Sequence, residues 1–348
     1  MYENVEISSG LVGKELGEDI FLENGSLLLG RGVELTQTHI ELLKQRAGRQ
    51  MIKAGTRKQL ASEKLSRMYQ QSLDDIKRQF QRLSEGEIPP IHEVKDSYMP
   101  LIEQLLKTEH TQPLFSLIEQ SDNYTYKHSL NVGIIASIIG KILQLPVYSL
   151  ALLVEMGIHH DLGKLALGGI VGKEGTLSQT EWKQMKMHTI EGFNLLQKMG
   201  EKREDVLYSA LLHHERLDGS GYPAGVRGDK IPYLVQIVSV ADTYDAITTE
   251  RHYQRKGSPV KAIQEMMADT YEGRLNPAIT VPFARYLMRQ YLRKSVNLTN
   301  GSRGEVIFIN YNEPHQPLVL LENGSVIDLR KNNHITILAD DNQHLQTS

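Results

Sequence analysis

The chain has 348 residues, 40% of them hydrophobic, so it is long enough for one large domain and one or two smaller ones. It contains no cysteine, which excludes disulfides, cysteine nucleophiles and thiolate ligands and leaves nitrogen and oxygen as donors to a metal. A net charge of −3 argues against a broad surface for duplex DNA or anionic lipid and fits a small phosphorylated substrate.

The N-terminus has no features of a secreted or membrane-anchored protein. Its first residues lack the basic and apolar segments of a signal peptide, and they contain no run of roughly 18 apolar residues that could cross a bilayer. We therefore expect a cytoplasmic protein without a membrane span.

The N-terminal quarter of the chain predicts two parts. Residues 1–55 form a small β-rich unit, with short strands on both sides of the turn Asn24-Gly25 and a helix from Thr36 to Arg46. Residues 56–90 form a helical linker. We interpret its strongly polar helix, Ser62 to Leu83, as a stalk for a homodimer or a signalling partner.

Residues 91–294 carry helical patterns and form the predicted main domain. The expected helices are Ser129–Leu143, Val147–His160, Thr180–Met199, Asp205–His213, Tyr233–Thr249, Pro259–Thr270 and Pro277–Tyr291. Residues 295–348 change to β-branched runs with a second Asn-Gly turn, which predicts a short antiparallel β cap and a tail. The fold class is therefore mainly α, a helical bundle between a β-rich N-terminal unit and a C-terminal β cap.

Histidines are concentrated in the predicted bundle. Six of the 13 histidines lie between His128 and His214, most of them near the ends of helical patterns. A single helical histidine is usually a core or surface residue, but this grouping predicts helix ends that point into one cleft. The glycine-rich loop from Asp218 to Gly225 follows the last pair and is expected to shape a substrate pocket.

The motif HHDLGK, His159 to Lys164, has the spacing of a metal site with more than one ion. On a helix, His160 and Asp161 lie about 100° apart, so they can reach two different ions with the carboxylate between them. Nitrogen and carboxylate ligands suit iron, manganese, zinc or nickel, and this number of ligands favours two ions over one.

Two neighbouring metal ions suit in-line displacement at phosphorus, because they activate a water and hold both the attacking and the leaving oxygen. The chain has no cysteine, no Gly-x-Ser-x-Gly motif and no GxxxxGK[ST] loop, which sets aside the usual nucleophilic hydrolases and the P-loop ATPases. The residues thus predict a metal-dependent phosphohydrolase.

Five segments resemble the HD-GYP family of bacterial cyclic di-GMP phosphodiesterases, within the HD phosphohydrolase superfamily. The segments are YTYKHSLNV (Tyr124–Val132), HHDLGK, KMHTIEGFNLL (Lys186–Leu196), HHERLDGSGYPAGVRGDKIP (His213–Pro232) and VADTYDAITTER (Val240–Arg251). The two-residue HD pair is a weak signature, whereas the loop that contains GYP is highly specific. The resemblance implies an HD-type helical bundle for residues 91–294.

The resemblance also implies roles for individual residues. The metal ligands that correspond to the family pattern are His128, His160, Asp161, His188, His213, His214 and Asp242. Asp161 and Lys164 would be catalytic, with the ammonium of Lys164 stabilising the bridging hydroxide or the charge of the transition state. Arg251 would hold a substrate phosphate through its planar fork, and Gly221 and Tyr222 would line the nucleoside side of the pocket.

Three positions depart from the family pattern. Gln254 stands where a cation is common, although Arg255 follows it, and Lys173-Glu174-Gly175 replaces a usual KPG. Tyr124 occupies the position, four residues before the first histidine ligand, at which trinuclear members carry a glutamate. Because a phenol with an ordinary pKa of about 10 is a poor substitute for a carboxylate, we expect a binuclear centre.

The expected reaction is hydrolysis of cyclic di-GMP to linear pGpG by in-line attack of a metal-bridging hydroxide, with slow further cleavage to GMP. The expected cofactors are two divalent metal ions, iron or manganese, with zinc or nickel as alternatives. Two other hypotheses stay open: a catalytically silent module that binds a cyclic dinucleotide and signals through the helix 62–83, and a phosphohydrolase of another cyclic dinucleotide or nucleotide.

Overall fold

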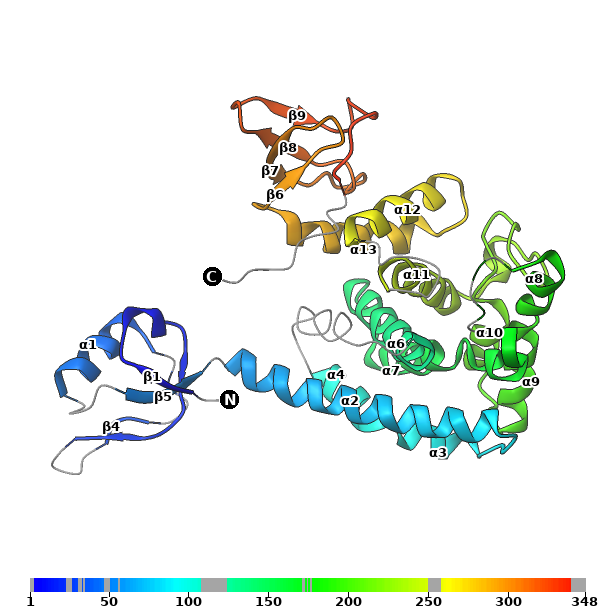
Figure 1. The fold of residues 1–348 in the computed structure, drawn as a ribbon, viewed down its shortest axis with the longest axis horizontal. Helices are drawn as coiled ribbons and strands as arrows, with labels where there is room; N and C mark the ends of the chain where they lie inside the picture. The colour runs from blue at the N-terminus through cyan, green and yellow to red at the C-terminus, as the bar shows by residue number, and fades with distance from the viewer. Residues whose placement is uncertain are drawn as a thin grey trace. The chain divides into compact units, whose positions relative to one another are not determined.

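The structure is a computed structural model with two compact units, Met1–Gln71 and Ser72–Ser348 (Figure 1). It describes residues 3–22, 27–30, 33, 35–46, 51–55, 57–107, 124–170, 173, 175, 177–249 and 258–338. Among the described helices, none combines the length and the apolar character needed to cross a membrane.

The first unit is the expected small β-rich fold. Its elements are β1 (Glu3–Glu6), η1 (Ser9–Leu11), β2 (Glu15–Leu16), β3 (Ile20–Phe21), β4 (Leu27–Leu29), α1 (Gln37–Arg46) and β5 (Met51–Gly55). β5 lies between β1 and β2 in an antiparallel sheet, and β3 pairs with β4. Leu16, Ile40, Leu43 and Ile52 lie in its buried core. The predicted turn Asn24-Gly25 falls outside the described residues.

Helix α2 (Arg57–Ser84) extends from the first unit into the second and is longer than the sequence predicted. Although its composition is polar, its apolar residues recur every three or four positions, which places them on one face. Leu73, Ile76 and Phe80 on this face are buried, and the ring of Phe80 meets that of Tyr126 edge-on at 5.8 Å. Within the described part of the second unit, this face of α2 therefore belongs to the core.

The second unit is mainly α-helical, which confirms the predicted fold class. Its elements before the C-terminal sheet are α3 (Ile91–Asp96), α4 (Met99–Lys107), α6 (Tyr124–Ile142), α7 (Val147–His159), η2 (Leu162–Ile170), α8 (Gln179–Lys186), α9 (His188–Lys198), α10 (Glu204–Leu212), η3 (Gly228–Lys230), α11 (Tyr233–Thr248), α12 (Pro259–Tyr271), α13 (Pro277–Met288) and η4 (Arg289–Tyr291). The segment predicted as one helix, Thr180–Met199, is two: α8 starts at a capping box of Ser178 with Glu181, and Met187 separates it from α9.

Helices α6 and α7 pack side by side and are in close contact because two glycines face each other (Figure 1). A Cβ added to Gly157 would lie 2.4 Å from the Cα of Gly133, so any larger residue would push the helices apart. Both helices are apolar on nearly all sides, as is typical of buried helices. Their contact brings His128 on α6 close to His160, which directly follows α7.

The C-terminal part of the second unit is an antiparallel sheet with the strand order β6-β7-β8-β9. The sequence predicted an antiparallel β cap here, but not the first strand, β6. The strands are β6 (Ser295–Asn297), β7 (Arg303–Phe308), β8 (Leu318–Leu321) and β9 (Val326–Asp328). Val296, Val306 and Val319 are its buried side chains. Gly324, with φ of +83°, makes the turn from β8 to β9.

A partly buried ionic network holds α3, α7 and the start of α10 together. Arg203 contacts Glu155 at 2.6 Å and Glu201 at 2.8 Å, and Lys95 lies 3.3 Å from Glu155 and 3.2 Å from Glu201. Burial alone would raise the pKa of both glutamates, but the hydrogen bonds of Arg203 hold the pKa of each below its ordinary value. Glu155 lies on α7 shortly before the HHD sequence, so the network supports the helix that delivers the site residues.

We expect Arg203→Met to lower the free energy of unfolding by about 1.5–3 kcal/mol, because two carboxylates lose charged hydrogen bonds while they stay largely buried. Urea unfolding followed by circular dichroism measures this. Lys261→Met is the matched control, since it removes only an exposed ion pair with Glu265 and should cost less than about 1 kcal/mol. Equal losses in the two variants would show that the network adds no stability.

Candidate metal centre

Five of the seven predicted ligands lie at or beside helix ends, and the other two lie within helices. His128 is in the first half of α6, and His160 and Asp161 directly follow α7. His188 is the first residue of α9, and His213 and His214 directly follow α10. Asp242 lies within α11. All seven are buried or nearly so, and the structure brings them together around one point.

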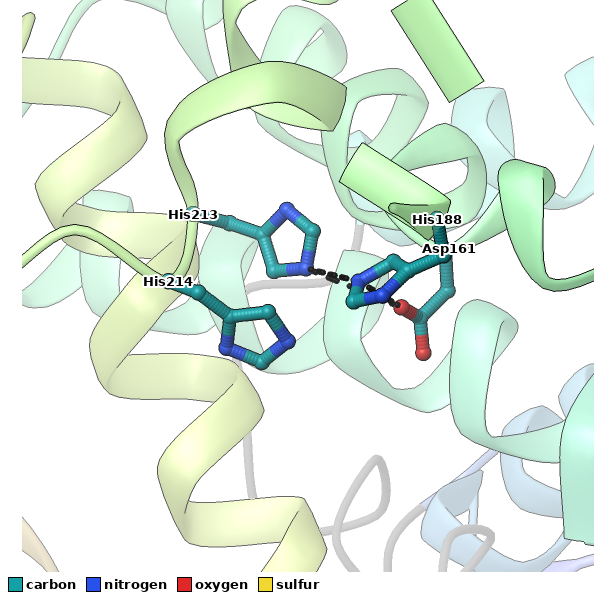
Figure 2. A group of neighbouring side chains, drawn as sticks. All are labelled: Asp161, His188, His213 and His214. Carbon is teal, nitrogen blue, oxygen red and sulfur yellow. Dashed lines mark hydrogen bonds and ion pairs between the residues drawn. The ribbon is translucent and has the colours of Figure 1, made fainter. Parts of the chain in front are cut away.

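Asp161 stands at the middle of this cluster. Its side chain takes part in two groups with metal-binding spacing, one with His188, His213 and His214 and the other with His128 and His160. Figure 2 shows the first group, in which the Oδ1 of Asp161 lies 3.3 Å from the Nε2 of His188 and 3.6 Å from the Nε2 of His213. The Oδ2 of Asp161 faces the second group, 3.5 Å from the Nε2 of His128 and 3.4 Å from that of His160. One carboxylate thus faces two sets of imidazoles.

Backbone carbonyls fix the ring orientation of three of these histidines. The Nδ1 atoms of His160, His188 and His213 contact the carbonyl oxygens of Gly157, Met185 and Ser209 at 2.7, 2.6 and 2.9 Å. A carbonyl oxygen can only accept a hydrogen bond, so each Nδ1 must carry the proton. In the neutral ring, the Nε2 that points into the cluster then has a free lone pair, as a metal ligand requires.

Burial holds three of the imidazoles neutral, those of His188, His213 and His214. Burial lowers the pKa of His188 to about 3, and it also lowers the pKa values of His213 and His214. His188 and His213 therefore present two unprotonated Nε2 atoms to each other at 3.3 Å, where neither can donate (Figure 2). The buried Nε2 of His160 and Oδ1 of Asp161 also make no hydrogen bond within the described part of the chain. Bound cations, one at each group, would satisfy these atoms.

The carboxylates of the cluster are held ionised. Burial alone would raise the pKa of Asp161, but the charges of Lys164 and His160 hold that pKa well below its ordinary value. Burial would also raise the pKa of Asp242, but a hydrogen bond from His128 and the charge of His160 keep it well below the ordinary range. Neutral imidazoles at His188, His213 and His214 and ionised carboxylates at Asp161 and Asp242 are the protonation states that divalent metal ions bind. His128 differs: burial would lower its pKa, but the three aspartates around it hold that pKa well above the ordinary value, so a bound metal ion must displace a proton from its Nε2.

Asp242 completes the side of the cluster that faces α11. Its Oδ1 lies 3.2 Å from the Nε2 of His128 and 3.8 Å from that of His160, and its Oδ2 lies 3.9 Å from the Nδ1 of His214. It therefore reaches residues of both groups. His159, the neighbour of His160, lies outside the cluster: its Nε2 is 3.5 Å from the hydroxyl of Tyr98 in the core, and burial lowers its pKa to about 4.

Asp245 is a residue of the site that the sequence analysis missed. It is fully buried, and its Oδ2 accepts from the Nδ1 of His128 at 2.7 Å while its Oδ1 accepts from the amide of Asn131 at 3.0 Å. This bond directs the Nε2 of His128 toward Asp161 and Asp242 in the same way that carbonyls direct the other histidines. The spacing was a signal: Asp245 follows Asp242 by three residues, close to one helical turn.

We expect Asp245→Asn to weaken metal binding about 10- to 100-fold, the usual cost of losing a carboxylate that orients a histidine ligand. Competition with a coloured chelator measures the affinity. Glu204→Gln is the control, because it removes an exposed carboxylate on α10. An unchanged affinity in Asp245→Asn would show that Asp245 does not orient a metal-binding imidazole.

Lys164 and the loop residues lie at the edge of the cluster. The ammonium of Lys164 contacts the Oδ2 of Asp161. The ring of Tyr222 lies against that of His214, tilted by 32° with 4.6 Å between the centroids, and burial raises the pKa of the Tyr222 hydroxyl. Gly221 lets the loop approach the backbone of the His214 segment, since a Cβ there would lie 2.4 Å from the carbonyl oxygen of His214. Arg251 lies outside the described residues.

Glu215 is a second residue that the sequence analysis missed, and it fixes the loop. It is buried, and its Oε1 accepts hydrogen bonds from the backbone nitrogens of Ala224 and Gly225 at 2.7 and 3.0 Å. Beside the loop, a cavity of about 320 Å³ opens next to His214. Its lining residues are Trp182, Lys186, His214, Arg216, Ser220, Gly221, Tyr222, Asp269 and Arg274.

Tyr124, the departure that led to the prediction of a binuclear centre, begins α6 one turn before His128. Its side chain is outside the described part of the chain. The prediction of two metal ions thus depends on the sequence and on the two groups that share Asp161.

Residues 114–279 match the family model of the HD domain. The chain is 31% identical over 201 residues to the cyclic di-GMP phosphodiesterase PA4108 of Pseudomonas aeruginosa. This alignment covers 57% of the present chain and 48% of the relative. It is 30% identical over 188 residues to a cyclic di-GMP phosphodiesterase of Thermotoga maritima, with 51% and 50% covered. It is also 30% identical over 162 residues to the 3'3'-cGAMP-specific phosphodiesterase 3 of Vibrio cholerae, with 46% and 35% covered.

The chain thus spans half or less of the length of these curated relatives. Among solved structures, Bd1817, an HDGYP protein from Bdellovibrio bacteriovorus, superposes with a TM-score of 0.51 at 16% sequence identity. The match covers 82% of this chain and 99% of that chain, and it concerns the fold alone. An HD domain with a His/Asp cluster of this kind binds divalent metal ions.

Proposed function

We propose that this chain, whose residues 114–279 match the family model of the HD domain, is a metal-dependent phosphodiesterase of the HD-GYP type that hydrolyses a cyclic dinucleotide. One observation carries the proposal. The Nε2 atoms of His188 and His213 face each other at 3.3 Å with their lone pairs inward, and the ionised Asp161 lies beside both. A cation at this point satisfies these atoms, whereas hydrogen bonding among them cannot.

The ligand set we propose for the metal centre has seven members: His128, His160, Asp161, His188, His213, His214 and Asp242. Asp161 would be shared between two ions, because its two oxygens face different sets of histidines. Two divalent ions, iron or manganese, fit a set of five imidazoles and two carboxylates without sulfur. Tyr124 in place of a glutamate supports two ions over three, since a phenol would have to lose its proton to help hold a third.

Divalent ions at this site would supply Lewis acidity, which activates water and draws charge from the phosphodiester. The residues of the chain would do the rest. Asp161 and Lys164 would hold the reacting groups in line, with the ammonium placed where negative charge grows in the transition state. Tyr222 stays protonated, since burial raises the pKa of its hydroxyl, and so it could donate a hydrogen bond to substrate. Arg251 would bind a phosphate of the substrate through its planar fork.

The proposed substrate is cyclic di-GMP, and the proposed main product is linear pGpG, with slow cleavage to GMP. The names of the Pseudomonas and Thermotoga relatives support cyclic di-GMP. A 3'3'-cGAMP substrate is the second candidate, because the Vibrio relative is specific for that dinucleotide. The two substrates differ in one purine base, so the choice between them depends on base recognition.

The test is an anaerobic assay of metal-replete protein with cyclic di-GMP, 3'3'-cGAMP and cyclic di-AMP, with products separated by chromatography. We expect linear dinucleotide from cyclic di-GMP, and its formation should stop when a chelator is added. Metal-replete protein that turns over none of the three would overturn the proposal and would favour a binding module without activity.

A further inference from the structure

The cavity beside His214 has features of a base-binding pocket that the metal centre does not need. Its volume of about 320 Å³ lies within the range of small-molecule sites, roughly 300–1,000 Å³. The neighbouring rings of His214 and Tyr222 line it, so the cavity begins directly at the metal centre. Because the cavity begins at His214, a nucleotide whose phosphate lies at the metal ions could reach into it with its base.

One wall of the cavity is aromatic and cationic. Trp182 is the only tryptophan of the chain, and 47% of its surface is exposed, which is unusual for so large an apolar side chain. The Nζ of Lys186 lies 5.8 Å from the centre of its ring and 5.0 Å from the centre of the Tyr222 ring. An exposed ring beside a cation is a platform on which a base can stack.

The lining of the cavity also includes a charged pair. The Nη2 of Arg274 contacts the Oδ1 of Asp269 at 2.8 Å, and both side chains line the cavity and are partly exposed. The Nε of Arg274 is buried and makes no hydrogen bond to any residue that the structure describes. Glu272 also pairs with Arg274, but it is 60% exposed and does not line the cavity.

This pair matches the edge of a guanine. Guanine presents the acceptors O6 and N7 next to the donors N1–H and N2–H₂, so an arginine beside a carboxylate can bind both sets. Adenine would present an amino group to the arginine and the N1 lone pair to the carboxylate, which leaves charged groups unmatched. The pair therefore discriminates between two bases that stack equally well.

We propose that the cavity is a purine-binding subsite in which Asp269 and Arg274 select guanine and Trp182 stacks on the base. The inference rests on the proposed function for the placement of the phosphate at the metal centre. It goes further because it assigns the base preference to two residues: Asp269 in the last turn of α12 and Arg274 in the loop that follows.

The test is calorimetric binding of GMP and AMP to metal-replete protein. Neither nucleotide contains a phosphodiester between nucleosides, so the measurement does not depend on hydrolysis. The result is expressed as the ratio of the affinity for GMP to the affinity for AMP, in which the contribution of the phosphate cancels. We expect GMP to bind more tightly by about 5- to 150-fold, which corresponds to one good paired contact with a base edge. Asp269→Asn should bring the ratio close to one, because its amide can donate to N1 of adenine.

Glu272→Gln is the matched control, since it removes the other carboxylate partner of Arg274 outside the cavity and should leave the ratio unchanged. Trp182→Ala should lower the affinity for GMP and the affinity for AMP by similar factors, about 5- to 150-fold, because stacking does not depend on which base is bound. Should Asp269→Asn fail to fold by circular dichroism, Arg274→Gln provides the same test with Asp269 in place.

Equal affinities for GMP and AMP in the wild type would overturn the inference. The inference would also be overturned if both Asp269→Asn and Arg274→Gln kept the wild-type preference for GMP over AMP. The same holds if Glu272→Gln reduced this preference as much as those two variants do. If the ratio behaves as expected but no cyclic dinucleotide is hydrolysed, the proposed function fails while the subsite stands.

Discussion

Asp161→Ala is expected to abolish hydrolysis of cyclic dinucleotides and to release the bound metal, while the helices stay in place. Its carboxylate faces both groups of histidines, so its removal takes a ligand from both ions at once. Loss of a residue that only orients a ligand costs about 10- to 100-fold, and loss of a shared ligand should cost more than that. Product formation, elemental analysis and far-UV circular dichroism on one preparation measure the three effects.

Glu204→Ala provides the control for Asp161→Ala, because it removes an exposed carboxylate on α10 and should change neither activity nor metal content. The assignment of Asp161 would be wrong if Asp161→Ala kept both its metal and its activity. A variant that kept its metal but lost turnover would instead give Asp161 a role in the chemistry without a role in metal binding.

Gly163→Ala is the second change with a large expected effect, since it should prevent assembly of the metal centre. A Cβ at Gly163 would lie 1.9 Å from the carbonyl oxygen of His188 and 2.4 Å from the backbone nitrogen of Gly192. Both contacts are with backbone atoms of α9, so the segment that carries Asp161 and the helix that begins with His188 must separate. Overpacking usually lowers the free energy of unfolding by about 1–3 kcal/mol. We expect a loss at or above the upper end of this range, because backbone atoms cannot move aside as a side chain can.

Thermal unfolding and metal content measure the effect of Gly163→Ala. The facing substitution Gly192→Ala is the matched control: its Cβ would lie 3.2 Å from the backbone nitrogen of Gly163, so a small shift accommodates it. We expect a clearly lower melting temperature and little bound metal in Gly163→Ala, and a much smaller change in Gly192→Ala. Similar results for the two variants would show that close approach at Gly163 is not required.

The sequence could predict the residues that meet in the site because their signals are local. Adjacent pairs such as His160-Asp161 and His213-His214 project in two directions from one helix end, and the GYP-containing loop marks the fold in which they come together. The helices were predictable for the same reason. Apolar periodicity and start signals lie within one segment of the sequence, as with the prolines Pro259 and Pro277 that begin α12 and α13.

What the sequence could not predict depends on contacts between distant segments. Asp245 orients His128 across 117 positions of the chain. Its spacing from Asp242 places it on the same face of α11, but no local pattern specifies His128 as its partner. The close approach of Gly133 and Gly157 becomes visible only when α6 and α7 are packed together. The apolar face of α2 was likewise hidden by a polar composition, because its few apolar residues matter by their spacing rather than by their number.

The central claim is that turnover needs a metal centre built on the seven proposed ligands, and one titration tests it most directly. Protein stripped with a chelator under anaerobic conditions is loaded stepwise with Mn²⁺ or Fe²⁺, and linear dinucleotide formation from cyclic di-GMP is measured against the metal bound per chain. We predict no activity in the stripped protein and a rise that reaches its plateau at two ions per chain. Activity that survives stripping, or a plateau that requires one ion or three, would contradict this account.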